Sequence, residues 1–198
     1  MHRFAIFAGY ACLWLFLASC SRGTPPPGAA LEVEAAPAAW LPEVGEPAAC
    51  PDGGRLQASF YGALEGNIDW GANDMSCEGM PRPAGAGARL RFAGSAGEDG
   101  LNIAVIIAIP QLERGKLASD LPSNVTIIEE GKGRFFSTAS LDYCWVDIER
   151  AGPVSEAAMT TAVGGTLSCI APLAEANGDT SVTISDLRFS GFVDWSGG

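Results

Sequence analysis

The stretch Leu101-Asn102-Ile103-Ala104-Val105-Ile106-Ile107-Ala108-Ile109 decides the fold class of this 198-residue chain. A branched aliphatic residue stands at every second position, so an extended strand points five such side chains to one face. Pro110 cannot donate to a strand ladder and ends the run. Since the other face is also largely apolar, we expect this strand to lie in the middle of a sheet or to be covered on both faces.

Shorter runs with the same alternation follow one another along the chain, with Gly and Pro between them. They span residues 56–62, 89–93, 125–129, 134–138, 141–148, 166–171, 182–184 and 187–195. Helical patterns are almost absent, and only residues 111–118 and 155–161 allow a turn or two of helix. Eight or nine short strands with so little helix predict an all-β fold, either an antiparallel β-sandwich or a jelly roll.

The first twenty residues have the organisation of an export signal. His2 and Arg3 precede residues 4–19, an uncharged, mostly apolar stretch of sixteen residues that is short for a membrane span. The stretch runs into Leu17-Ala18-Ser19-Cys20, which joins a branched residue, two small residues and a cysteine. This tetrad resembles the lipobox of bacterial lipoproteins.

The resemblance implies that residues 1–19 are a signal peptide and that Cys20 carries a diacylglycerol on its thiol. The partner of this end of the chain would then be a membrane of the cell envelope. Because Ser21 is not Asp, the sorting rules of the family imply the outer membrane if the cell has two membranes. Two alternatives remain open, a noncleaved anchor helix and an ordinary secretory signal with a chance cysteine. The folded domain is exported in each case.

Composition divides the rest of the chain into a tether and a domain. Residues 20–49 are dominated by Pro, Ala, Gly and Glu, a composition typical of spacers. Residues 50–198 are long enough to bury one hydrophobic core.

The domain contains four cysteines, an even number that predicts two disulfides in an oxidising compartment. They are Cys50, Cys77, Cys144 and Cys169. Of the three pairings, we prefer Cys50 with Cys77 and Cys144 with Cys169, because each pair consists of sequence neighbours. Zinc is a weaker alternative, since no Cys-x-x-Cys spacing occurs and the domain contains no His. We expect no metal and no cofactor.

Charge and residue usage exclude several classes of function. The formal net charge of -11 opposes binding to polyanions, so nucleic acid is not an expected partner. His2 is the single histidine, and its loss with the signal peptide removes every catalytic mechanism that needs imidazole.

The candidate ligand-binding residues are Tyr143, Trp145, Asp147 and Glu149, which alternate along one predicted strand. The rings suit a stacking platform for sugars, and the two carboxyl groups suit glycoside hydrolysis. The plain alternative is that the rings cover the sheet and the acids face solvent. Our leading hypothesis is a noncatalytic, lipid-anchored protein that binds or supports another envelope component, either a protein or a glycan. A carbohydrate-binding module is the second hypothesis and a carboxylate-based glycoside hydrolase the third.

Overall fold

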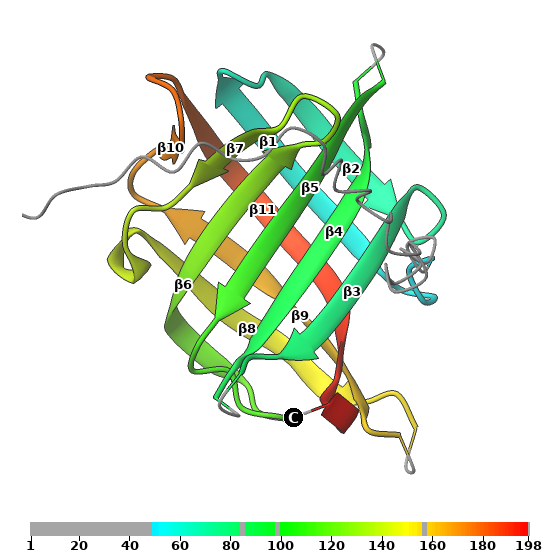
Figure 1. The fold of residues 1–198 in the computed structure, drawn as a ribbon. Helices are drawn as coiled ribbons and strands as arrows, with labels where there is room; N and C mark the ends of the chain where they lie inside the picture. The colour runs from blue at the N-terminus through cyan, green and yellow to red at the C-terminus, as the bar shows by residue number, and fades with distance from the viewer. Residues whose placement is uncertain (1–48, 84–85, 98–99, 156–157, 198) are drawn as a thin grey trace, which may run out of the picture. The chain divides into compact units, whose positions relative to one another are not determined.

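The computed structural model describes residues 49–197 apart from 84–85, 98–99 and 156–157 (Figure 1). The predicted signal peptide, Cys20 and the tether up to residue 48 lie outside the described residues. The described part is all-β, with eleven strands and two short 3-10 helices. The strands are β1 (Arg55–Gly62), β2 (Gly66–Gly71), β3 (Met75–Pro81), β4 (Ala88–Ala96), β5 (Leu101–Ile109), β6 (Ala118–Glu129), β7 (Arg134–Ser137), β8 (Cys144–Pro153), β9 (Thr160–Cys169), β10 (Leu173–Glu175) and β11 (Ser181–Asp194), and the 3-10 helices are η1 (Leu141–Tyr143) and η2 (Trp195–Gly197).

The strands form one hydrogen-bonded network that folds over into two layers. One layer contains β3, β4, β5 and the second half of β6, and the other contains β2, β1, β11, β9 and β8. Figure 1 shows the strands of the two layers crossing at a large angle. All strand pairs are antiparallel, so the predicted all-β, sandwich-like antiparallel fold is confirmed.

Strand β6 belongs to both layers. Its first half pairs with β8, where Leu121 faces Val146, and its second half pairs with β5, where Val125 faces Ile107. The short strands β7 and β10 make a second connection, because β7 pairs with β6 while β10 pairs with both β7 and β11. The layers are therefore joined through the backbone as well as through the core.

The core forms where the predicted alternation points side chains inward. In β5 the side chains of Ile103, Val105, Ile107 and Ile109 are fully buried, and β4 and β6 flank the strand, which confirms its central position. Phe92 of β4 and Phe189 of β11 contact each other across the layers, with ring centroids 6.2 Å apart.

The layers lie close together where β3 crosses β11. A Cβ atom on Gly79 of β3 would overlap the backbone oxygen of Phe192 in β11. Because that oxygen belongs to a strand backbone, it cannot swing aside as a side chain could. Glycine at this position therefore permits the layer spacing.

The structure contains more strand than the sequence predicts. Strands β2, β3 and β10 were not expected, because they are short or interrupted by glycine and are held by pairing with their neighbours. The predicted runs 182–184 and 187–195 are one strand, β11, whose register against β1 shifts near Asp186, a residue with a φ of 54°.

The predicted helical turn over residues 111–118 is wrong. Residues 111–117 form turns and an irregular connection, and residue 118 already begins β6. Gly115 lies in this connection with a φ of 73°, which an α-helix does not accommodate. The second predicted segment, 155–161, includes residues 156–157, which lie outside the described residues. The backbone N–H of Ala158 donates to the oxygen of Ser155 at 3.0 Å, and residue 160 already begins β9.

Both preferred disulfides are present. Cys144 and Cys169 face each other on β8 and β9, with Cα atoms 4.1 Å apart. Cys50 joins Cys77 of β3, with Cα atoms 4.7 Å apart, and so fixes the chain that leads into β1. In the chain-entropy account, each closed loop of this length stabilises the fold by about 3 to 4 kcal/mol.

Candidate functional site

The outer face of β8 carries part of the predicted ligand-binding row. Cys144, Val146 and Ile148 are buried, so Trp145 and Asp147 point outward and are half-buried. This alternation agrees with the prediction for the first half of the strand. The other two candidates do not continue this row: Tyr143 precedes the strand, and Glu149 lies at an irregularity in its second half.

Tyr143 lies before the strand, in η1. This turn begins at Ser140, whose hydroxyl accepts a hydrogen bond from the backbone N–H of Asp142 at 3.2 Å. The backbone oxygen of Tyr143 accepts a hydrogen bond at 2.9 Å from the backbone N–H of Ile170, just beyond β9. Tyr143 therefore lies beside the end of β9, at one corner of the layer.

Apolar side chains gather at this corner. Ile170 is 74% exposed and Tyr143 is 37% exposed. Trp145 lies opposite Pro122 of β6 and Ser168 of β9 on the outer face, and Ile170 follows Ser168 by two positions. Residues on one face at this spacing are diagonal neighbours across a strand pair. We call Tyr143, Trp145 and Ile170 the aromatic corner.

Asp147 has a structural partner. Its Oδ1 atom accepts a hydrogen bond at 2.8 Å from the backbone N–H of Asp120. Asp120 has a φ of 55° and lies where the register between β6 and β8 shifts. A bulge leaves backbone groups without a ladder partner, and the carboxylate of Asp147 supplies one.

Glu149 leaves the predicted row because of a second bulge. The register between β8 and β9 shifts between Ile148 and Arg150, and Glu149 is the extra residue. Its side chain borders a shallow depression of about 430 Å³ that Asp147 does not line. The two carboxyl groups proposed for hydrolysis therefore do not share one hollow.

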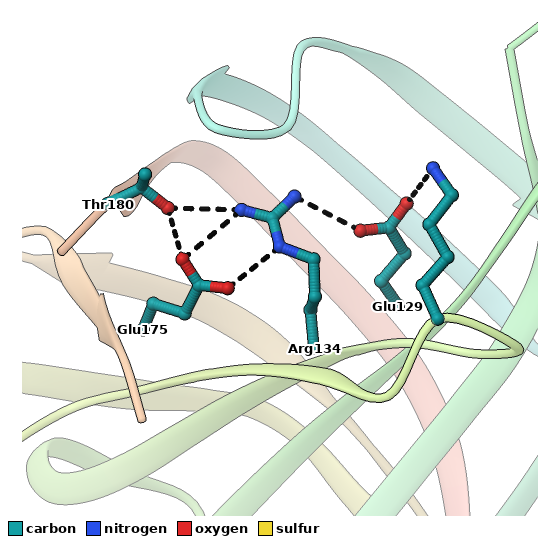
Figure 2. Close-up of polar contacts among 5 residues, drawn as sticks. Glu129, Arg134, Glu175 and Thr180 are labelled. Atoms are coloured by element: carbon teal, nitrogen blue, oxygen red, sulfur yellow. Dashed lines mark hydrogen bonds and ion pairs between the residues drawn. The ribbon is translucent and has the colours of Figure 1, made fainter. Parts of the chain in front are cut away.

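A network of charged side chains lies where β6, β7 and β10 meet (Figure 2). Arg134 of β7 contacts Glu175 of β10 through its Nε atom at 2.8 Å and Glu129 of β6 through Nη1 at 3.2 Å. Glu129 is almost completely buried, and Lys132 Nζ contacts its other oxygen at 2.6 Å. The Arg134 guanidinium also lies over the ring of Phe136, 4.9 Å from its centroid.

This network favours the ionised form of Glu175. The guanidinium of Arg134 and the hydroxyl of Thr180 both hydrogen-bond the Glu175 carboxylate and lower its pKa to about 2. Because the side chains bind one another, the network ties β10 to the hairpin of β6 and β7. Its role is therefore structural. The sequence carried no signal for it, because Arg134 and Glu175 lie far apart along the chain.

A hollow of about 900 Å³ lies where the connections β3–β4 and β5–β6 meet η2. Its apolar lining includes Leu112, Leu121, Trp195 and the largely exposed Leu117. The indole Nε1 atom of Trp195 is buried and has no hydrogen-bond partner among the described residues. Near η2, the backbone N–H of Ser196 hydrogen-bonds the carboxylate of Asp194 and lowers its pKa.

Neither a metal centre nor a membrane helix is found in the described part of the chain. Its His, Cys, Asp and Glu side chains form no group of three or more that could hold a metal ion. None of the helices in residues 49–197, the three gaps excepted, has the length and apolar character needed to cross a membrane. Comparisons with protein-family models, with curated proteins and with solved structures gave no match.

Proposed function

We propose that this chain is a lipid-anchored protein of the bacterial cell envelope whose β-sandwich domain binds or supports another envelope component without catalysis. The observation that carries the proposal is the tetrad Leu17-Ala18-Ser19-Cys20 after an uncharged stretch. The lipid on Cys20 would hold the domain at the membrane, since each buried methylene contributes about 0.8 kcal/mol and two or more acyl chains anchor stably.

The two disulfides support an exported location. Disulfides persist in oxidising compartments and are rare in the cytosol, where thiols are kept reduced. All four domain cysteines are used in these bonds. The outer membrane is the location that Ser21 favours in a cell with two membranes.

The surroundings of the acids favour binding over hydrolysis. A glycoside hydrolase needs one carboxyl group that stays protonated as a general acid and a second one across the substrate. Asp147 instead accepts the hydrogen bond of Asp120, and Glu149 borders a different surface. For Glu175 and Asp194 the pKa is lowered, the opposite of what a general acid requires.

A carbohydrate-binding domain is the second candidate. The aromatic corner presents an exposed tyrosine and a half-buried tryptophan close to polar groups such as Ser168. Aromatic faces of this kind stack on the apolar faces of sugar rings.

The proposal is tested by changing the predicted acceptor, as Cys20→Ser, with Cys12→Ser as the matched control. Cell fractionation should find the wild type and the Cys12 variant in the membrane fraction and the Cys20 variant in a soluble or unprocessed form. Mass spectrometry of the native protein should find lipid on the Cys20 sulfur. An unmodified Cys20 with the leading peptide still attached would overturn the proposed anchor.

A screen of the purified protein against envelope polysaccharides tests the noncatalytic role. We expect the protein to hydrolyse none of these polysaccharides. Hydrolysis that disappears in Asp147→Asn or Glu149→Gln would overturn this half of the proposal.

A further inference from the structure

Several arginine side chains lie close together on the outer face of the layer formed by β2, β1, β11, β9 and β8, which we call the second layer. Across the strands, Arg150 of β8 faces Gly164 of β9, Gly164 faces Ser190 of β11, and Ser190 faces Arg55 of β1. Arg188 precedes Ser190 by two positions on β11 and therefore points to the same face. Three arginines thus surround one serine, in a protein whose formal net charge is -11.

Glycine makes this part of the face hollow. Gly164 carries no side chain, and a Cβ at its position would lie 3.6 Å from Nε of Arg150. The Arg150 side chain therefore crosses above Gly164 and donates to the hydroxyl of Ser190. That hydroxyl donates in turn to the backbone oxygen of Gly53 at 2.8 Å. All of these residues line the depression of about 430 Å³ that Glu149 borders.

The three guanidinium groups are not equivalent. Arg55 already binds Asp69 through two hydrogen bonds, at 3.1 and 3.0 Å. Arg150 and Arg188 have no carboxylate within 4.0 Å among the described residues. Asp186 and Glu149 are the nearest acids along their own strands. Both residues line the depression, and their guanidinium groups have N–H donors that no carboxylate of the described residues occupies.

We propose that the depression around Ser190 binds a phosphate group, held by Arg150 and Arg188. Each guanidinium presents a fork of two parallel N–H groups. Two such forks bind one phosphate group more readily than one carboxylate, because a phosphate group has more terminal oxygens. A phosphate group therefore suits the two guanidinium groups, while the Ser190 hydroxyl holds Arg150 and donates to Gly53. This site is separate from the aromatic corner and does not depend on the lipid anchor.

The overall negative charge restricts what can carry the phosphate. The net charge repels an extended polyanion, whereas a single phosphate group contacts only the local cluster. The ligand class is therefore a small phosphate ester or a molecule with one accessible phosphate group. Glu149 borders the site, so its carboxylate opposes the bound anion.

The test titrates the purified full chain with inorganic phosphate, glucose 6-phosphate and glycerol 3-phosphate at a fixed ionic strength near 0.15 M, followed by calorimetry. We expect saturable binding of at least one of them, and the tightest identifies whether the phosphate is free, carried by a sugar or carried by a lipid headgroup. Acetate is the competing oxyanion and should bind more weakly.

The following variants distinguish a binding site of defined geometry from general attraction to positive charge. Arg188→Gln or Arg150→Gln should weaken binding about tenfold or more, because each removes a charge-assisted fork. Arg188→Lys should bind less tightly than the wild type because lysine keeps the charge without the fork. Glu149→Gln should bind about twofold to fivefold more tightly. Arg89→Gln, an exposed arginine on β4 without an ion pair among the described residues, is the matched control.

Three results would overturn the proposal. The first is the absence of saturable binding by all three phosphate compounds. The second is acetate binding as tight as that of phosphate. The third is that Arg150→Gln and Arg188→Gln both bind with the affinity of the wild type. Circular dichroism of each variant checks that the fold is intact.

Discussion

The carboxylate of Asp147 on β8 accepts a hydrogen bond from the backbone N–H of Asp120 on β6, with 2.8 Å between the two atoms. This contact lies at the bulge where the first half of β6 pairs with β8. It therefore secures the strand that both layers share.

Asp147→Ala should destabilise the domain by about 1 kcal/mol, because the backbone N–H of Asp120 loses its acceptor. Asp147→Asn keeps an oxygen at the same position and should lose less. Urea unfolding measures both. Glu149→Gln is the control on the same strand, and we expect it to unfold like the wild type. Equal stability of the alanine variant and the wild type would show that the contact contributes nothing.

Glu175 should make the stability of the domain depend on acid pH. Its pKa is lowered to about 2 from an ordinary value of 4.5, so the unfolded chain binds a proton before the folded one does. The stabilisation is fully present above about pH 4.5 and is lost as the pH falls toward 2. Glu175→Gln removes it. The difference in melting temperature between the wild type and this variant should therefore shrink between pH 5 and pH 2.

The control for this measurement is Glu78→Gln. Glu78 is exposed on β3 and has no ion pair among the described residues. The melting temperature of the Glu78→Gln variant should change with pH as that of the wild type does. A Glu175 variant that also follows the wild-type curve would contradict the role of Arg134.

Gly79→Ala should destabilise the domain by about 1 to 3 kcal/mol, because the new methyl group meets the backbone oxygen of Phe192. Gly152→Ala is the matched control on β8, since a Cβ there meets nothing within 4 Å. It should change the stability by no more than about 0.5 kcal/mol. Thermal unfolding of both variants makes the comparison, and a Gly79 variant as stable as the Gly152 variant would refute the close crossing of β3 and β11.

The aromatic corner can be tested by titrating the full chain with soluble cell-wall glycans while following tryptophan fluorescence. If the corner binds sugars, Trp145→Ala and Tyr143→Ala should each weaken binding by about tenfold. Tyr61→Ala, which removes a tyrosine that is 56% exposed on β1, should leave binding unchanged. A spectrum unchanged by every glycan would discard the carbohydrate hypothesis.

The parts of the fold that local sequence determines could be predicted. Strand β5 was predicted as a central strand because its alternation is nearly uninterrupted, and both disulfides were predicted because each joins sequence neighbours. Strands such as β10, with three residues, could not be predicted, since pairing with β7 and β11 holds them in place.

The candidate site was predicted only in part, because the sequence pattern does not show where the register of a strand shifts. A period of two places Trp145 and Asp147 on one face, but it does not reveal the bulge that displaces Glu149 or the turn that holds Tyr143. The arginines around Ser190 come from β1, β8 and β11. Only the pairing of these distant strands brings them together.

The pairing of β1 with β11 governs when the domain can form. β1 is the first described strand and β11 the last, and Arg55 lies opposite Ser190. A nascent chain that has emerged only as far as β9 therefore leaves β1 without this neighbour and the second layer without its central strand. Contacts between such distant segments also slow folding. The second layer is therefore completed only once the last described strand is available.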